Sequence, residues 1–144
     1  MWFDRQDQRV LFGDIRSEDH TLCDGRVFNI TPDINMDWRS MPFPDGHFRL
    51  VVFDPPHLVR AGRDSWMRAK YGVLGENWRE DLRQGFAECF RVLAPHGVLI
   101  FKWADIQVPV REVLALTDQK PLFGHRSGKR EKTHWMTFMK PGAA

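Results

Sequence analysis

The feature that most constrains this chain is an apolar run that ends at two consecutive prolines. Residues Phe48 to Phe53 read FRLVVF, and Asp54-Pro55-Pro56-His57, here termed the DPPH turn, follows directly. Because proline fixes its φ near −65° and lacks a backbone N–H, the run cannot continue into a sheet beyond Phe53. The sequence therefore predicts a buried strand over residues 48–53 with a rigid polar turn at its carboxyl end.

Glycine and proline residues divide the rest of the chain into short apolar segments. Predicted strands cover residues 9–15, 26–30, 98–103, 121–123 and 133–139, and predicted helices cover residues 82–93 and 110–116. Strands that alternate with helices are typical of an α/β fold with a mostly parallel sheet and ligands at the strands' carboxyl ends. The last two strands flank a basic turn, so we expect them to form an antiparallel hairpin at the sheet edge.

The length and composition fit a single domain covering residues 1–144. With 42% hydrophobic residues in 144, a chain of this size buries roughly two thirds of its unfolded surface without disulfides. The longest apolar runs are about five residues, far below the roughly 20 of a membrane span, and the amino terminus MWFDRQDQRV has no apolar signal segment. These features, with only two cysteines, predict a reducing, cytoplasmic location and no membrane partner.

Histidine and cysteine residues do not form a metal-binding pattern. His20 and Cys23 have an H-x-x-C spacing, but a structural zinc site needs about four ligands. Cys89, the second cysteine, lies within the predicted helix 82–93. The sequence therefore predicts no bound metal.

The formal net charge of +2 conceals an acidic front and a basic end. Residues 1–59 contain 6 Lys and Arg against 10 Asp and Glu, whereas residues 120–144 contain 6 against 1. A basic cluster suits the phosphates of DNA or RNA, and it is equally typical of a solvated face. The candidate phosphate contacts on the hairpin turn are Arg126, Lys129, Arg130 and Lys132.

Residues 60–77 show no sustained period and contain three glycines. We expect a long loop or irregular lid there, and loops of this length tend to be functional. Trp66 and Tyr71 lie in this segment among arginines and a lysine, which predicts either stacking on nucleic-acid bases or a lid packed on the core. Lys102 and Trp103 end the strand 98–103 and are expected to line the same cleft, with core packing as the alternative for Trp103.

The DPPH turn carries groups that can hold the exocyclic amine of a planar base. A carboxylate and a rigidly held backbone carbonyl can accept the amine's hydrogen bonds, and the ring of His57 can stack on the base. The alternative is that the prolines merely end the strand and that His57 caps a neighbouring group. Asp54, Pro55, Pro56 and His57 are therefore the candidate catalytic residues.

Three motifs in order resemble the class I S-adenosylmethionine-dependent methyltransferases. An acidic residue, Asp37, is followed by Met41-Pro42-Phe43 and the strand 48–53; the DPPH turn resembles the family's Asp, Asn or Ser followed by Pro-Pro and an aromatic residue; and Val92 to Phe101 resembles the vLkPGGxLv passage. The resemblance covers about residues 33–103. It implies a shortened Rossmann-like methyltransferase sheet with S-adenosylmethionine as cofactor. The whole chain is also similar to small, mostly phage-associated proteins of this kind.

The resemblance assigns roles residue by residue. Asp37 would accept a hydrogen bond from the cofactor's adenine amine, and Trp38 would flank the adenine ring. Asp14 would hold the ribose hydroxyls, although a lone acidic residue at a strand end is also typical of a cap or a surface position. The DPPH turn would face the substrate nitrogen.

The chain departs from the family pattern at two places. No glycine-rich loop precedes Asp14, so the usual first strand is missing or replaced. Either the methionine end of the cofactor is held by Phe12 and Gly13 or by a second subunit, or the chain has lost the cofactor. In addition, His57 stands where nitrogen-modifying members carry Tyr, Phe or Trp.

The sequence thus predicts an enzyme, a methyltransferase acting on an exocyclic amino nitrogen of a base in DNA or RNA. The alternative is a catalytically degenerate methyltransferase-fold module that binds nucleic acid or a partner subunit. A domain short of one central strand gains from a second copy of the chain or a partner methyltransferase subunit that covers the open edge.

Overall fold

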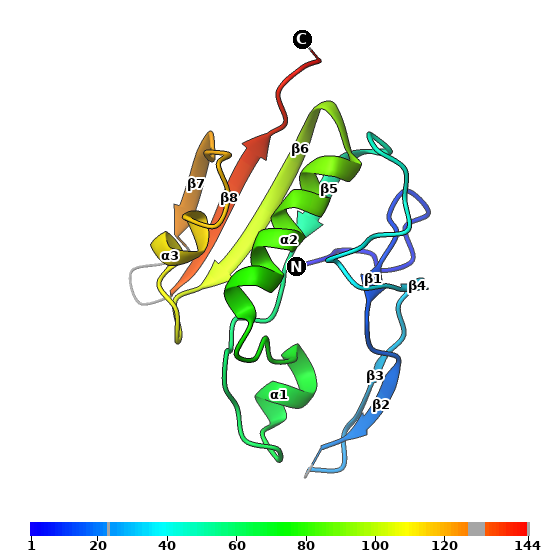
Figure 1. Cartoon of the computed structure of the whole chain (residues 1–144). Helices are drawn as coiled ribbons and strands as arrows, with labels where there is room; N and C mark the ends of the chain where they lie inside the picture. Colours follow the sequence, from blue (N-terminus) through cyan, green and yellow to red (C-terminus); the bar gives the residue numbers. More distant parts are fainter. Residues whose placement is uncertain (23, 127–131, 144) are drawn as a thin grey trace.

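The computed structural model describes residues 1–22, 24–126 and 132–143 of the chain. Its centre is a four-stranded sheet in the order β5-β6-β8-β7 (Figure 1). These strands are β5 (Phe48–Phe53), β6 (Leu93–Ala104), β7 (Phe123–Arg126) and β8 (Thr133–Met139). The predicted strand 48–53 is confirmed at both ends, because the two prolines of the DPPH turn stop β5 where the sequence indicates.

The central sheet is mixed, so the prediction of a mostly parallel sheet is wrong for it. β5 pairs with β6 in parallel, whereas β8 pairs with both β6 and β7 in antiparallel register. A parallel pair needs a crossover, and the chain between β5 and β6 includes a helix. The predicted antiparallel pairing at the sheet edge is confirmed, but its first strand covers Phe123–Arg126 and not residues 121–123.

Helix α2 (Trp78–Val92) crosses one face of this sheet (Figure 1) and buries the core beneath it. Phe86 is 1% exposed, and its ring centroid lies 4.8 Å from that of Phe101 on β6. Glu80 and Asp81 occupy the first turn, where negative charge favours the helix dipole. The predicted helix is confirmed, and it begins four residues before Leu82.

Gly85 lets two aromatic rings approach α2 closely. A Cβ atom at this position would lie 2.7 Å from Cζ of Phe53 and 2.9 Å from Cδ1 of Trp38. Because Gly85 has no side chain, the end of β5 and the segment containing Trp38 can pack closely against α2.

The amino-terminal third forms two small sheets beside β5 (Figure 1). β1 (Gly13–Asp14) pairs in parallel with β4 (Ile34–Asn35), and β2 (Glu18–Thr21) pairs in antiparallel register with β3 (Val27–Ile30). The predicted strand 9–15 is thus reduced to two residues. β2 was not indicated by its sequence, EDHT, because backbone pairing and not apolar alternation holds it.

The segment 60–77 contains helix α1 (Trp66–Tyr71) within loops. Ser65 caps its start, and Gly72, with φ 77°, ends it. Further along, α3 (Val110–Leu114) begins at the residue expected for the second helix. Within the described ranges, no helix is long and apolar enough to cross a membrane.

Candidate active site

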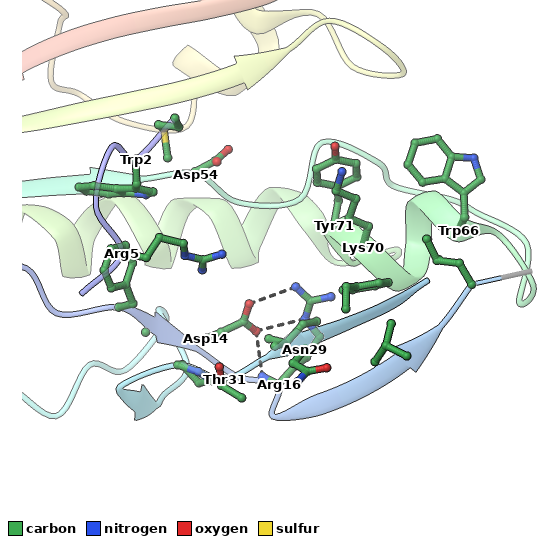
Figure 2. Close-up of a pocket in the computed structure, with 18 of the residues that line it drawn as sticks. Trp2, Arg5, Asp14, Arg16, Asn29, Thr31, Asp54, Trp66, Lys70 and Tyr71 are labelled. Atoms are coloured by element: carbon green, nitrogen blue, oxygen red, sulfur yellow. Dashed lines mark hydrogen bonds and ion pairs between the residues drawn. The ribbon is translucent and has the colours of Figure 1, made fainter. Parts of the chain in front are cut away.

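A cavity of about 970 Å³, here termed the main cavity, lies between the amino-terminal sheets and the DPPH turn (Figure 2). One wall comes from β1 and the β2–β3 hairpin, and the other comes from the DPPH turn and α1. The candidate residues that line it are Phe12, Gly13, Asp14, Asp54, Pro55, His57, Trp66 and Tyr71. These candidate residues lie far apart in the sequence and were identified by three separate arguments. In the structure they surround one cavity.

Asp54 stands at the carboxyl end of β5, where a cation from the next strand meets it. Nζ of Lys102 lies 3.3 Å from Oδ1 and 3.2 Å from Oδ2 of this carboxylate. Phe53 pairs with Phe101 in the β5–β6 register, which brings the residues that follow them side by side. Pro55 is buried, so the turn is fixed by packing as well as by its two prolines.

The ring of His57 is largely enclosed, with 14% of its side chain exposed. Its edge meets Trp103 at 5.3 Å between ring centroids, and Nε2 lies 3.5 Å from Oδ1 of Asp54. Burial lowers the pKa of His57; Asp54 opposes this shift and the charge of Lys102 adds to it. His57 is therefore a neutral imidazole at neutral pH, and its buried Nδ1 has no hydrogen-bond partner among the described residues.

Trp103, like Lys102, is not among the residues that line the main cavity, which corrects the expectation that both line it. It is fully buried, and its indole N–H donates to the carbonyl of Val108 at 2.9 Å. Successive residues of a strand face opposite sides, so Lys102 and Trp103 point to opposite faces of β6. The alternative prediction of core packing is confirmed for Trp103, whose ring also contacts that of His57.

The Asp14 carboxylate projects from β1 into the main cavity, with Arg16 beside it (Figure 2). Oδ1 accepts from the backbone N–H and Nε of Arg16, and Oδ2 accepts from its Nη2 at 3.0 Å. Nη1 of Arg16 also donates to the carbonyl of Ala69 at 3.1 Å. Arg16 thus joins the β1 wall to α1.

Helix α1 forms one end of the cavity and buries none of its residues. Trp66 is 56% exposed and Tyr71 is 42% exposed. Nζ of Lys70 lies 6.0 Å from the ring centroid of Trp66 and 5.1 Å from that of Tyr71. A Cβ on Gly72 would lie 3.2 Å from Cγ of Pro56, so the end of α1 rests directly on the DPPH turn.

Asp37 and Trp38 do not line the main cavity, and Trp38 lines a smaller cavity beside β5. Their expected roles beside the cofactor remain predictions. Arg39 binds both oxygens of Asp37, and its hydrogen bonds hold the pKa of that carboxyl below its usual value. Arg39 in turn donates to Asp81 of α2. Trp38 packs under α2 and against Phe53, with ring centroids 5.7 Å apart. Arg39 and Gly85 thus draw this segment toward the helix.

The described basic residues at the ends of β7 and β8 do not line the main cavity. Arg126 and Lys132 are exposed and are not among its lining residues. Lys129, Arg130 and Cys23 lie outside the described residues. In the part of the chain that is described, no three His, Cys, Asp or Glu side chains are placed to hold a metal ion.

Several lining residues were missed by the sequence analysis. The rings of Trp2 and Phe12 pack edge to face with their centroids 4.9 Å apart, and Cζ of Arg5 lies 5.6 Å from the centroid of the Phe12 ring. Asn29 and Thr31 enter from the end of β3 (Figure 2). These residues lie in short segments outside residues 33–103, which carry the resemblance to methyltransferases. The one feature that could have indicated them is the aromatic side chain of Trp2 within a charged amino terminus without periodicity.

Comparisons with known proteins give matches in structure alone. No protein-family model matches the sequence, and no curated protein matches it. The PH0226 protein of Pyrococcus horikoshii aligns with TM-score 0.54 and 16% identity over 73% of this chain and 57% of that one. TTHA0409 of Thermus thermophilus, a candidate DNA modification methylase in complex with S-adenosyl-L-methionine, aligns with TM-score 0.52 and 19% identity over 75% of this chain and 54% of that one.

This chain therefore spans little more than half the length of the structures that it matches. At these identities the likeness concerns the fold. The chain shares the Rossmann-like α/β fold of a protein that has been solved with S-adenosylmethionine bound.

Proposed function

We propose that the chain transfers the methyl group of S-adenosylmethionine to an exocyclic amino nitrogen of a nucleic-acid base. The observation that carries this proposal is the main cavity, which has Asp14 on one wall and the DPPH turn on the other. Its volume of about 970 Å³ lies at the upper end of ligand pockets, which measure about 300–1,000 Å³. A cofactor and an acceptor base can share a space of that size. The fold shared with TTHA0409 supports the choice of cofactor.

The residues beside Asp14 fit the cofactor's polar groups. A carboxylate with Asn29 and Thr31 next to it suits a pair of neighbouring hydroxyls, which need both acceptors and donors. Phe12 and Trp2 offer aromatic surface for a planar ring, and Gly13 lines the same wall. When bound, S-adenosylmethionine supplies a methyl group already activated by the positive charge on its sulfur.

The acceptor side needs positioning more than acid–base chemistry. Asp54 and the carbonyl of Pro55 would accept the two N–H groups of the amine and so direct its lone pair away from the turn. The ion pair with Lys102 holds the Asp54 carboxylate in place for this task. The neutral ring of His57 would stack on the base and can accept a proton that the nitrogen loses.

Helix α1 supports a nucleic-acid substrate. Exposed aromatic rings beside a lysine suit stacked bases and their phosphates, and such stacking contributes about 1–3 kcal/mol per base. Trp66 and Tyr71 have this arrangement at the cavity, with Lys70 between them. Because α1 buries no residue, its aromatic side chains are not explained by core packing. Arg126, Lys129, Arg130 and Lys132 remain proposed phosphate contacts.

The test uses methyl-labelled S-adenosylmethionine with single-stranded DNA, duplex DNA and single-stranded RNA. After digestion, the label is expected on the exocyclic nitrogen of adenine or cytosine, with single-stranded acceptors preferred. Label on a ring atom would contradict the assigned chemistry. Absence of transfer to all three acceptors, by a chain that binds the cofactor, would refute the proposed substrate class.

A degenerate binding module is the second candidate, and two ion pairs favour it. Asp14 is paired with Arg16 and Asp37 with Arg39, so both expected cofactor contacts already hold a cation. Calorimetric titration with S-adenosylmethionine separates the candidates. The enzyme requires heat of binding that is lost in Asp14→Ala and kept in Asp37→Ala, whereas the module shows no heat and still binds oligonucleotides.

A further inference from the structure

A second cavity, of about 350 Å³, lies between the amino-terminal segment with β1 and the outer edge of β5. We term it the strand slot. Leu50, Val51, Val52 and Phe53 all line it. Consecutive residues of a strand point to opposite faces, so four in a row can border one space only where that space lies against the strand's edge.

Both strands that border the strand slot have an open edge. Among the described residues, β5 pairs with β6 on one side only, and β1 pairs with β4 on one side only. Phe12 and Gly13 line the slot from the β1 side. The open edge of β5 therefore presents a row of backbone N–H and C=O groups to this space, and the two-residue β1 adds a short second edge. Such open edges are templates for pairing with another strand.

The lining of the strand slot defines what fits it. Apart from Arg9 and Asp54, its side chains are uncharged, and most are apolar. They include Met36, Met41, Phe43, Phe48, Cys89 and Val92. An occupant must therefore supply backbone hydrogen bonds to the β5 edge and uncharged, apolar side chains above and below, which is the chemistry of a buried β-strand.

The opposite edge of the sheet differs in each of these respects. All four residues of β7, including His125 and Arg126, are exposed. Charged residues on a short edge strand discourage pairing with another chain. The β5 edge is thus the one suited to accept a strand.

The strand slot also opens into the candidate active site. Trp2, Phe12, Gly13 and Asp54 line both cavities. A strand lying along β5 would therefore end near Asp54, and the residues after it would enter the main cavity between Asp54 and Asp14.

We propose that the strand slot binds an extended apolar segment of a partner polypeptide as an added β-strand, and that this strand completes the wall of the main cavity. The two structures that share the fold are longer chains, since this chain spans 57% and 54% of them. Strand addition of this kind draws affinity from main-chain hydrogen bonds and specificity from side-chain pockets. Only the effect on the main cavity rests on the proposed function.

Amide hydrogen exchange tests the binding directly. The probe is the acetylated and amidated hexapeptide TVLVIG, whose residues have high strand propensity. At millimolar peptide, amide exchange in β5 is expected to slow at least tenfold, while exchange in β7 stays unchanged. Leu50→Asp should abolish the effect, and Leu122→Asp should preserve it, because both leucines are exposed, at 55% and 62%, but only Leu50 lines the slot.

Three results would overturn the inference. These are unchanged β5 exchange with the peptide, equal slowing in β7, or a response that survives in Leu50→Asp. Protection that instead rises with protein concentration alone would assign the slot to a second copy of this chain and refute the partner polypeptide. None of these readouts involves methyl transfer, so failure here is distinct from failure of the proposed function.

Discussion

Nζ of Lys102 lies 3.2 Å from Oδ2 of Asp54, so a cation on β6 holds the carboxylate at the end of β5. The side chains are 23% and 30% exposed, which leaves the pair partly shielded from water. The parallel register of β5 and β6 creates this contact, and the DPPH turn prevents it from shifting.

Replacing Lys102 by Met should slow methyl transfer roughly tenfold without changing cofactor affinity, because a misplaced catalytic carboxylate loses rate and not binding. The same variant should raise the pKa of His57, since the charge of Lys102 lowers it. Kinetics and an NMR titration of His57 measure the two effects. Lys120→Met, an exposed lysine outside the cavity, is the control and should change neither.

Stability should fall as the pH drops below 6.5. Burial lowers the pKa of His57 from 6.5, so between the lowered value and 6.5 the unfolded chain binds a proton that the folded chain does not. The stability contributed by neutral His57 is full above pH 6.5 and decreases below it, with a slope of at most about 1.4 kcal/mol per pH unit. Urea unfolding from pH 8 to 5 should show this slope in the parent chain and in His125→Phe. A slope of equal size in His57→Phe would disprove the assignment.

Removing the aromatic rings of α1 should weaken binding of single-stranded nucleic acid. Trp66→Ala and Tyr71→Ala should each reduce affinity about 5- to 100-fold, as expected for loss of one stacked base. Fluorescence anisotropy with a labelled oligonucleotide measures this. Phe123→Ala removes a ring that is 68% exposed outside the main cavity, and it should leave affinity unchanged. Equal losses in all three variants would indicate nonspecific contacts.

Gly85→Ala should destabilise the fold, because the added methyl overpacks the contacts with Phe53 and Trp38 at a cost of about 1–3 kcal/mol. This loss should exceed the roughly 1 kcal/mol that alanine gains over glycine in a helix. Chemical denaturation measures the difference. Gly62→Ala is the control, since a Cβ there meets nothing within 4 Å; a more stable Gly85→Ala chain would show that the rings can move aside.

The sequence indicated the fold best where local signals were strong. Two prolines fixed the end of β5, and helical spacing of apolar residues from Leu82 identified α2. The mixed sheet was not foreseen, because alternation of strands and helices carries no information on the direction of β8. β2 and β4 were missed because they are short and are held by pairing with distant residues.

The candidate site could be predicted only where local sequence signals marked its residues. Asp14 and Asp54 end strands that run toward one edge, and the structure brings them to one cavity. The binding of Asp37 to Arg39, and through it to Asp81, could not be predicted because it depends on how α2 packs. The burial of Trp103 could not be predicted, because the packing of α2 on the sheet decides which face of β6 is buried.

The central claim is tested most directly by methyl transfer from labelled S-adenosylmethionine to single-stranded DNA by the parent chain and by Asp54→Ala. The parent should label the DNA, and Asp54→Ala should lose roughly 100-fold in rate while binding the cofactor with unchanged affinity. Asp118→Ala, an exposed carboxylate outside the cavity, should retain full activity. Full turnover by Asp54→Ala would contradict the account.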